Sequence, residues 1–417
     1  MSKVKDSSLS SMGRKRVQWA KAHMPVVAKI AEDFSERKPF RGLTVAISLH
    51  VTKETAVLVE AISSGGARIA LCGCNPLSTQ DEVAAALSEL PGVEVFAWRG
   101  QTNKEYYDCI NDVLEFSPDI TIDDGCDLIS QIHTNRRELI KKIRGGCEET
   151  TMGVNRLRAM EKDGALKYPV IAVNDAYTKY LFDNRYGTGQ STIDGILRAT
   201  SVLFAGKTVV VVGYGWCGKG ITMRSSGMGA NVVVVEVDPI RALEAVMDGY
   251  RVMGMNEAAK VGDIFVTATG NTDVINLEHI KRMKNGVILA NAGHLDREIK
   301  VSDLKKLARK VERINDVAEI YELDKDRKIY LLGEGRIINL VAAEGHPSEV
   351  MDTSFATQAL SCEYINKNYK KLEPRVYITP REQDEKIARM KLESMGIYID
   401  TLTSTQKKYL SDWREGT

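Results

Sequence analysis

The feature that most constrains the fold is a glycine-rich turn between a run of valines and a helical segment. Residues 207–212 read Lys-Thr-Val-Val-Val-Val, which is typical of a buried strand, and Gly213, Gly215 and Gly218 follow in the spacing GxGxxG. In dinucleotide-binding units the first glycine makes the turn. The second lets the backbone approach a pyrophosphate, and the third packs the helix onto the sheet. The chain is therefore expected to bind a dinucleotide on a Rossmann unit.

The next predicted strand, 231–235, ends in an acidic residue that indicates which dinucleotide is bound. Glu236 lies where a carboxylate accepts hydrogen bonds from the adenosine ribose 2′-OH and repels a 2′-phosphate, which favours NAD. Arg241 stands nearby and suits a 2′-phosphate, so NADP stays open. Polar side chains also follow two later strands that are expected beside the nicotinamide half: Thr269, Asn271, Asn291 and His294.

Length and composition narrow the class of protein. A chain of 417 residues is too long for one core, so two domains are expected. The net charge of +1 gives no field that attracts nucleic acid or an anionic membrane, and no apolar run approaches the ~20 residues of a membrane span. No signal sequence is recognisable, and a cytoplasmic location is expected. Cys72-Gly-Cys74 has no nearby histidine, so no metal site is expected.

The order of apolar and amphipathic segments predicts parallel sheets. A helix is expected over 15–33, and the polar, glycine-containing segment 174–191 is expected to form half of a hinge. Strands and crossover helices should alternate in the first part of the chain, as is typical of a parallel sheet. The expected strands are 44–48, 67–72, 93–97 and 120–122, and the expected helices are 53–63, 79–90 and 103–116.

The predicted architecture is α/β, with two Rossmann-like parallel-sheet domains and a short C-terminal helical extension. The NAD domain is expected to be inserted into the substrate domain. A helix near 351–366 and a last helix near 403–413 follow it. The expected boundaries are 1–176 for the first part of the substrate domain, 190–344 for the NAD-binding domain, 348–378 for the return segment, and 379–417 for a C-terminal segment that serves oligomerisation and covers the cofactor.

Eight strings resemble those of the adenosylhomocysteinase, or S-adenosylhomocysteine hydrolase, family in order and spacing. They are HVTKET, NPLSTQD, DDGCDL, GCEETTMGV, NDAYTKYLFDNRYG, GYGWCGKG, NAGH and EGRIINL…GHPSEVM, from about residue 15 to about residue 413. The resemblance implies reversible hydrolysis of S-adenosyl-L-homocysteine to adenosine and L-homocysteine, a step of the methyl cycle in one-carbon metabolism. One tightly bound NAD per subunit would oxidise the ribose 3′-OH and later reduce it. The family is usually homotetrameric.

The resemblance also implies residue roles. Lys179 with Asp183 would act at the 3′-OH, where a desolvated lysine can serve as a base, and Asp124 would take the C4′ proton. His50 and His294 would relay protons near C5′. Contacts to the nucleoside would come in addition from Thr52, Glu54, Glu149, Asn174 and His346. Contacts to the cofactor would come, beside the three glycines, from Thr150, Thr151, Asn184, Glu236, Arg241, Thr269, Asn271, Asn291, Asn339 and Gln406.

Two other classes of protein compete with this interpretation. An NAD-dependent 2-hydroxyacid dehydrogenase shares the inserted Rossmann layout, but it gives no role to Lys179, Asp183 and Asp124. A catalytically inactive homologue that acts as a regulatory binding protein should have lost some of these groups. The sequence departs from the animal-type family at Met152 and Thr188 and lacks its C-terminal tail, which indicates a short-tailed archaeal or thermophile-like form. Adenine or hypoxanthine preference, net direction and oligomeric state stay open.

Overall fold

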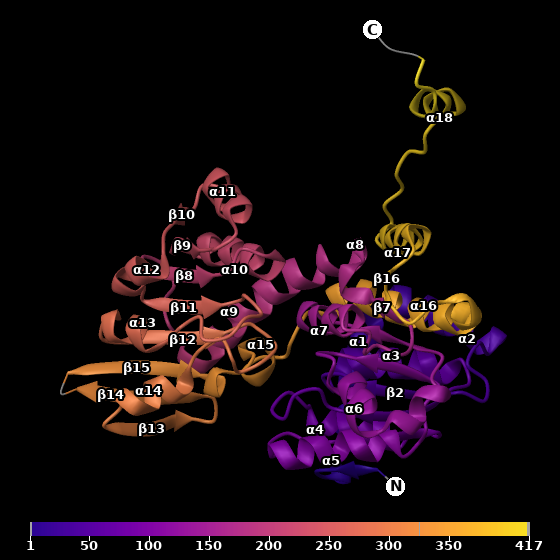
Figure 1. The fold of residues 1–417 in the computed structure, drawn as a ribbon, viewed down its shortest axis with the longest axis horizontal. Coiled ribbons are helices and arrows are strands. Elements are labelled where there is room, and N and C mark those ends of the chain that lie inside the picture. Colours follow the sequence, from indigo (N-terminus) through magenta and orange to yellow (C-terminus); the bar gives the residue numbers. More distant parts are fainter. Residues whose placement is uncertain (1, 325, 415–417) are drawn as a thin grey trace.

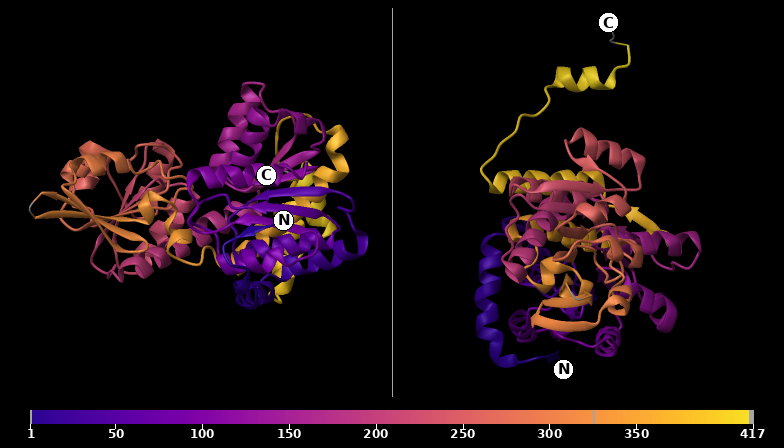
Figure 2. Two further views of the ribbon diagram at one scale, coloured as in Figure 1. Left: turned by 90° about the horizontal axis from the view of Figure 1, so that it is seen from below. Right: turned by 90° about the vertical axis from the view of Figure 1, so that its left-hand side faces the viewer.

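The structure is a computed structural model that describes residues 2–324 and 326–414. It consists of two α/β units, each built around one eight-stranded sheet with helices on both faces, and they lie side by side (Figures 1 and 2). The first sheet is parallel throughout, with the order β1-β4-β3-β2-β5-β6-β7-β16. Its strands are β1 Lys3–Val4, β2 Thr44–Ser48, β3 Arg68–Cys72, β4 Val93–Ala97, β5 Ile120–Asp123, β6 Gly145–Glu148, β7 Val170–Ala172 and β16 Val376–Ile378.

The strand order of the first sheet creates a crevice at one point. From β2 the chain runs outward through β3 and β4, then crosses back to form β5 on the other side of β2. The loops after β2 and β5 therefore leave the carboxyl edge in opposite directions. Such a switch point is where open parallel sheets bind their ligands. His50 follows β2 and Asp124 follows β5, so both stand at this crevice.

The second sheet has the order β10-β9-β8-β11-β12-β15-β14-β13 and is parallel except for its last strands. β14 pairs antiparallel with β15 and with β13, an addition that the sequence did not reveal. The strands are β8 Thr208–Val212, β9 Asn231–Val235, β10 Arg251–Val252, β11 Ile264–Thr267, β12 Val287–Asn291, β13 Lys310–Asn315, β14 Ala318–Asp324 and β15 Arg327–Leu332. Its switch point lies between β8 and β11, so the glycine-rich turn after β8 opens the second crevice.

The single helix expected over 15–33 is two helices. α1 ends at Ala22, and α2 begins at Pro25, because proline disfavours helical backbone in the residue before it and suits the first position of a new helix. The helices of the first unit are α1 Ser10–Ala22, α2 Pro25–Arg37, α3 Lys53–Ser64, α4 Asp81–Ser88, α5 Asn103–Leu114, α6 Asp127–Asn135, α7 Thr151–Lys162, α16 Ser348–Asn368 and α17 Arg381–Ser394.

The polar connection expected to form half of a hinge over 174–191 is largely helical. It contains α8 Tyr177–Tyr180, a π-helical turn over Asp183–Gly187, and the start of α9 Thr188–Thr200. The π turn is typical of functional sites, since it re-aims side chains within a helix. The second unit then carries α10 Trp216–Gly227, α11 Pro239–Met247, α12 Met255–Val261, α13 Leu277–Arg282, α14 Val301–Leu307 and α15 Ile338–Val341.

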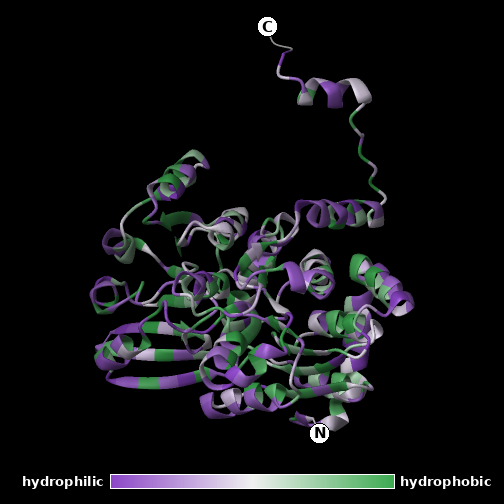
Figure 3. Cartoon of the chain, turned by 45° about the vertical axis from the view of Figure 1, so that its right-hand side comes forward, coloured by the Kyte–Doolittle hydropathy of each residue, from purple (hydrophilic) through white to green (hydrophobic). Residues whose placement is uncertain are grey.

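The chain returns to the first unit after the second sheet. α16 is buried along most of its length and leads through α17, which the sequence did not predict, into a separate C-terminal helix. That helix, α18 Ser404–Ser411, lies away from both units at the end of an extended segment without regular secondary structure (Figures 1 and 2). Figure 3 shows hydrophobic colouring concentrated on inner strands and helices, whereas α17 is mainly hydrophilic. Within the described residues, no helix is both long and apolar enough to span a membrane.

Candidate active site

The glycine-rich turn has the geometry that a dinucleotide requires. A Cβ on Gly218 would lie 1.9 Å from the carbonyl oxygen of Gly213, so only glycine lets α10 approach the end of β8 this closely. A Cβ on Gly215 would meet nothing nearer than Nη1 of Arg241, at 3.8 Å. The backbone at Gly215 therefore faces open space at the start of α10, where a pyrophosphate is stabilised by the helix N-terminus. These residues fit a bound dinucleotide.

Glu236 is fixed beside this turn by backbone amides. Its carboxylate accepts hydrogen bonds from the N–H groups of Tyr214 at 2.7 Å, Val237 at 2.6 Å and Asp238 at 3.0 Å. The acid is therefore held at the end of β9, where the adenosine ribose lies in Rossmann units. Arg241 is exposed on α11 with its guanidinium toward Gly215, so the acidic and the basic group predicted from the sequence border the same turn.

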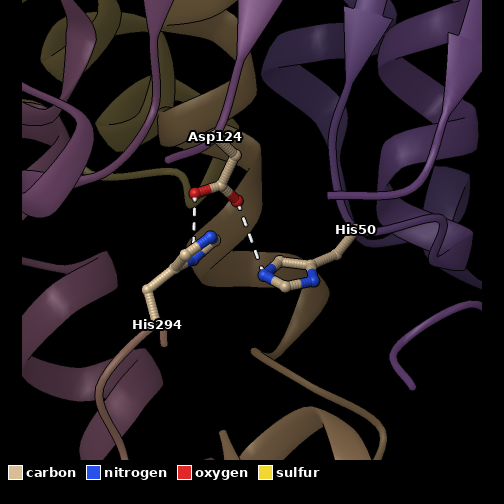
Figure 4. Close-up of side chains that lie close together, drawn as sticks. All are labelled: His50, Asp124 and His294. Carbon is tan, nitrogen blue, oxygen red and sulfur yellow. Dashed lines mark ion pairs between the residues drawn. The ribbon is translucent and has the colours of Figure 1, made fainter. Parts of the chain in front are cut away.

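Three residues that are far apart in the sequence form the first cluster of the site (Figure 4). Oδ2 of Asp124 lies 3.5 Å from Nε2 of His50, and Oδ1 of Asp124 lies 3.4 Å from Nδ1 of His294. His294 comes from the loop after β12 of the second sheet, so this cluster joins the two units. Gly125 has a φ of +105°, and a Cβ there would lie 2.6 Å from Nε2 of His294, so glycine is required for the approach.

The protonation state of His50 follows from its surroundings. Burial lowers the pKa of His50 to about 4, although the carboxylate of Asp124 acts in the opposite direction. The ring is therefore neutral near pH 7, with one nitrogen as donor and the other as acceptor. Nδ1 lies 2.7 Å from the hydroxyl of Ser78, which fixes the ring plane. A neutral imidazole between a hydroxyl and a carboxylate can relay a proton in either direction.

The second cluster surrounds a buried cation. Nζ of Lys179 lies 3.4 Å from Asp183, 3.6 Å from Glu149 and 2.9 Å from Oδ1 of Asn184, to which it donates a hydrogen bond. Asn184 in turn donates to Asn174 at 3.2 Å. Lys179 and Asp183 lie on α8 and the π turn, and the i,i+4 spacing brings them to one face. A cation held among several hydrogen-bonding groups is suited to fix sugar hydroxyls.

The charges in this cluster differ from the expectation of a lysine base. Burial would lower the pKa of Lys179, but Asp183 and Glu149 outweigh it, and the net effect is a raised pKa that keeps the ammonium form. Burial also acts to raise the pKa of Asp183, but Lys179 and His346 lower it, so this carboxylate is ionised. Burial raises the pKa of Glu149 to about 8 despite Lys179. Glu149 is therefore the group here that can exchange a proton near neutral pH.

A third group closes the site from the return segment. Nδ1 of His346 lies 2.9 Å from Oδ1 of Asp183, and its Nε2 lies 3.2 Å from Asn339 and 3.3 Å from Thr188. The predicted residues His346, Asn339 and Asp183 are thus brought together. Oδ1 of Asn339 and Oε1 of Glu149 are buried without a hydrogen-bond partner among the described residues, which is what a ligand-binding surface presents before a ligand is added.

Sequence reasoning missed the residues that hold the carboxylates in place. Three side chains of α16 donate hydrogen bonds to three buried acids: Ser348 to Glu54 at 2.6 Å, Ser354 to Asp183 at 2.7 Å and Gln358 to Glu149 at 2.5 Å. A signal was present, because this helix mixes polar residues into apolar positions on every face, which is unusual for a buried helix.

Glu148 is a further positioning residue that the sequence did not single out. It is fully buried, and burial raises its pKa well above the ordinary value, so it is protonated. Oε1 accepts hydrogen bonds from the N–H groups of Gly125 at 2.8 Å and Thr150 at 3.1 Å. Glu148 therefore links the loop that carries Asp124 to the start of α7.

Other predicted residues have different places. Thr52 is the N-cap of α3, and Thr151 donates to Asn174. The Asn291 side chain is satisfied internally, because it donates to the carbonyls of Gly293, Leu295 and Gly335 and accepts from Thr267 and Gly293, so it supports the loop that carries His294. Thr269 and Asn271 are exposed at the rim of the second crevice. Gln406 lies on α18 and caps that helix, away from the site of its own chain.

Two crevices, a dinucleotide turn and clusters of polar side chains that draw on both sheets define an NAD-dependent enzyme of the α/β class. Two family models match the chain. The model of S-adenosyl-L-homocysteine hydrolase matches residues 1–139, and the model of the NAD-binding domain of S-adenosyl-L-homocysteine hydrolase matches residues 184–345. The chain belongs to the S-adenosyl-L-homocysteine hydrolase family, and its cofactor is NAD.

Individual relatives match over nearly their full lengths. The chain is 62% identical to S-inosyl-L-homocysteine hydrolase of Methanocaldococcus jannaschii and 60% identical to the protein of that name from Methanococcus maripaludis, with 100% of each chain covered. It is 57% identical to adenosylhomocysteinase of Pyrococcus abyssi, covering 99% of this chain and 98% of the relative.

Proposed function

We propose that the chain hydrolyses S-adenosyl-L-homocysteine reversibly to adenosine and L-homocysteine, through oxidation and re-reduction of the ribose 3′-carbon. The observation that carries this proposal is the placement of two different proton-exchanging clusters at one site. Lys179 with its carboxylates suits the ribose hydroxyls, while Asp124 lies between two histidines on the side shared by both sheets. A simple dehydrogenase needs one such cluster, whereas oxidation followed by elimination needs both.

The first step is assigned to the cluster around Lys179. When bound, NAD supplies the acceptor for the hydride that leaves C3′ and returns it in the last step. The Lys179 ammonium would hold the 3′-oxygen by donating a hydrogen bond, and it stabilises negative charge that develops there. The proton of the 3′-OH has to move to a base, and the ionised fraction of Glu149, which lies beside Lys179 and has a pKa of about 8, is proposed to take it.

The second step is assigned to Asp124 and the two histidines. A ketone at C3′ acidifies the C4′ hydrogen, so Asp124 can remove that proton. The released electron pair forms a C4′–C5′ double bond as the C5′–S bond breaks, and the homocysteine sulfur leaves with the pair from that bond. His50 and His294 flank Asp124 and would pass a proton to the leaving thiolate and take one from the attacking water.

One spectroscopic experiment tests this function. Purified protein should carry NAD, and addition of adenosine should convert part of it to the reduced form, which absorbs in the near ultraviolet. Homocysteine that is added next should be consumed as the thioether forms, and a thiol reagent measures this loss of free thiol. A 2-hydroxyacid dehydrogenase would reduce NAD with hydroxy acids and leave the thiol untouched, and an inactive binding protein would change neither signal.

A second candidate substrate has specific support. S-inosyl-L-homocysteine differs from the adenosyl compound only at position 6 of the purine and its neighbouring N1, and two relatives that share 62% and 60% of this sequence carry its name. The steps at C3′, C4′ and C5′ are the same for both compounds. The base preference therefore depends on residues outside the two proton-exchanging clusters.

We propose the domain boundaries 1–176, 190–344, 348–378 and 379–417, with hinges near 174–191 and 344–348. Glu344 supports the second hinge, because its carboxylate pairs with Arg16 at 3.1 Å in the first unit and with Arg198 at 3.3 Å at the start of the second. Closure of the two units would exclude water from a reactive ketone. A nucleoside analogue should then reduce the radius of gyration measured by small-angle scattering.

The proposed assembly is a homotetramer in which the C-terminal segment reaches a neighbouring copy. α18 and the short segment after it expose Tyr409, Leu410 and Trp413, and the start of α11 with the segment before it exposes Val237 and Ile240 beside the cofactor turn. Docking of α18 on α11 of another copy would cover both apolar faces and bring Gln406 toward that copy's NAD. Removal of residues 397–417 should lower the mass found by light scattering. All seven cysteines are free thiols, in keeping with the proposed cytoplasmic location.

The remaining site assignments are proposals on the same basis. The nucleoside is proposed to contact Thr52, Glu54, Glu149, Asn174, Lys179, Asp183 and His346. The cofactor is proposed to contact Thr150, Thr151, Asn184, Gly213, Gly215, Gly218, Glu236, Arg241, Thr269, Asn271, Asn339 and, from a neighbouring copy, Gln406.

A further inference from the structure

The start of α3 carries an ion pair whose lysine has no role in the proposed hydrolysis. Nζ of Lys53 lies 3.1 Å from Oε1 of Glu54, and the two side chains are only 13% and 2% exposed. Lys53 is the first residue of α3, where the helix dipole disfavours a cation. A buried ion pair also adds little net stability, because desolvation offsets the attraction. The position of Lys53 therefore calls for an explanation other than stability.

The pair lies at one end of the row of acids held by α16. Ser348 holds Glu54 and Ser354 holds Asp183, and the six-residue step from one serine to the other spans about 9 Å along the helix axis. That length is comparable with the distance from the ribose 3′-oxygen of a nucleoside to the outer edge of its purine. If the sugar lies against Asp183, the purine edge reaches Lys53 and Glu54.

The segment around β2 supports the same placement. His50 belongs to the cluster assigned to C5′, and Glu54 follows it four residues later, in the first turn of α3. In a β-nucleoside C5′ and the base project from the same face of the ribose, whereas the 3′-OH projects from the other face. One short segment, 50–54, can therefore contact both C5′ and the base, while Lys179 approaches from the opposite side.

The chemistry of the pair matches a purine edge that presents one acceptor beside one donor. An ammonium only donates hydrogen bonds, and a carboxylate only accepts them. Ser348 and Lys53 both contact Oε1 of Glu54, so Oε2 is the oxygen left for a ligand in the described part of the chain. A 6-oxopurine presents an acceptor, O6, next to a donor, N1–H. A 6-aminopurine presents the two kinds of group in the opposite order, a donor at position 6 next to an acceptor, N1, so an ammonium that faces position 6 selects the 6-oxopurine.

We infer that Lys53 and Glu54 read position 6 and N1 of the purine, with Lys53 donating to O6 and Glu54 accepting from N1–H, so that the chain prefers S-inosyl-L-homocysteine. This inference rests on the proposed function and names its substrate class. Lys53 acts as a specificity-determining residue, and it takes no part in the proton transfers at C3′, C4′ and C5′. Its loss therefore changes the choice of base and leaves the chemistry at the ribose in place.

The test measures thioether synthesis by the NAD-loaded protein from homocysteine with inosine or with adenosine. The unmutated protein should show the higher kcat/KM with inosine. In Lys53→Met, which keeps the length of the side chain and removes its donor, the inosine-to-adenosine ratio of kcat/KM should fall by roughly 10- to 100-fold, as expected for a lost hydrogen bond to a charged group. Lys53→Arg keeps a donor and should hold the ratio within a few-fold. An unchanged ratio in Lys53→Met, or an equal loss with both nucleosides, overturns the inference.

Two control variants separate base reading from other effects. Lys21→Met removes a lysine that pairs with Glu60 on the exposed side of the same helix, at 3.0 Å, and the ratio should not change. Glu344→Gln removes the other acid near Lys53, whose carboxylate lies 3.9 Å from its Nζ. If Glu344→Gln shifts the ratio as far as Lys53→Met does, Lys53 acts through the hinge and the inference fails.

A binding measurement keeps the inference independent of the proposed reaction. Calorimetric titration of the NAD-loaded protein with inosine and with adenosine gives a ratio of dissociation constants for each variant. If no thiol is consumed with either nucleoside, the proposed function fails, and the binding ratio still decides whether Lys53 reads the base. Tighter inosine binding that is lost in Lys53→Met supports the inference, and equal binding of both nucleosides by the unmutated protein contradicts it.

Discussion

Nδ1 of His294 lies 3.4 Å from Oδ1 of Asp124, although the two residues follow strands of different sheets, β12 and β5. The loop of His294 is held by Asn291, and that of Asp124 is held by Glu148 through the N–H of Gly125. The acid–base cluster is therefore complete only when the two units lie together. Proton transfers that need His294 should slow when the two units separate. The groups around Lys179 should be less affected, because they belong to the first unit and to the connection between the units.

Asp124→Asn should separate oxidation from elimination. The amide keeps the size of the side chain but cannot take the C4′ proton, so thiol release should fall by a factor of about 10² or more, as expected for a lost general base. Reduced cofactor should accumulate, because the groups at the 3′-OH are intact. Absorbance and a thiol reagent report both quantities on one sample.

The matched control for that experiment is Asp163→Asn, the same change at an exposed residue after α7. It should alter neither signal. Release of homocysteine by Asp124→Asn at the unmutated rate would show that Asp124 is not the base at C4′.

Lys179→Ala should stop the reaction one step earlier. Without the ammonium, negative charge at the 3′-oxygen loses its stabilising partner, and little reduced cofactor should form on addition of nucleoside. The change also leaves Asp183 and Glu149 without their cation, so the free energy of unfolding should fall by about 3–5 kcal/mol. Cofactor content of the purified variant shows whether it is folded. Normal accumulation of reduced cofactor would contradict the role given to Lys179.

The stability of the protein should depend on His50 at mildly acidic pH. Its folded pKa of about 4 lies below the ordinary 6.5, so between these values the unfolded chain binds more protons, and stability falls as the pH falls. The difference corresponds to about 3 kcal/mol. Urea titrations of the protein and of His50→Gln at pH 7 and pH 4 should show the smaller loss in the variant. The same loss in both proteins would mean that His50 is not buried in its neutral form.

Glu236→Ala should weaken NAD binding by roughly 1–3 kcal/mol, because the ribose hydroxyl loses its acceptor and the amides of Tyr214 and Asp238 lose theirs. NADP should then bind relatively better, since the repulsion of its 2′-phosphate is removed while Arg241 remains. Calorimetric competition between the two cofactors measures the ratio. Equal affinity of the unmutated protein for NAD and NADP would contradict the assignment of Glu236.

The sheets were predictable because their signals are local. Runs such as Thr44–Ser48 and Asn231–Val235 match observed strands, and the GxGxxG spacing located the cofactor turn. Pro25, a strong local breaker, divides the first helix and could have been used to predict the break. The antiparallel strands β13 and β14 were missed, because β13 is exposed along its whole length and lacks an apolar pattern.

The composition of the site was predictable from its resemblance to a family, but its electrostatics were not. The protonation of Lys179 depends on the distance of Asp183 and Glu149, and Glu149 is far from Lys179 in the sequence. Burial is equally non-local, and it decides the opposite pKa shifts of Glu149 and His50. The three hydrogen bonds from α16 to the buried acids join residues that are 171, 209 and 294 positions apart, so no spacing rule could reveal them.

Because α16 holds Glu54 and Asp183 from two positions on one helix, the spacing between Ser348 and Ser354 acts as a ruler for the substrate. One inserted residue would shift the later serine by about 1.5 Å and turn it by about 100° around the axis, so base and sugar could no longer be held at once. Substitution at either end of this helix can therefore change the nucleobase preference without moving the sugar. An insertion or deletion between the two ends should instead uncouple base binding from sugar binding.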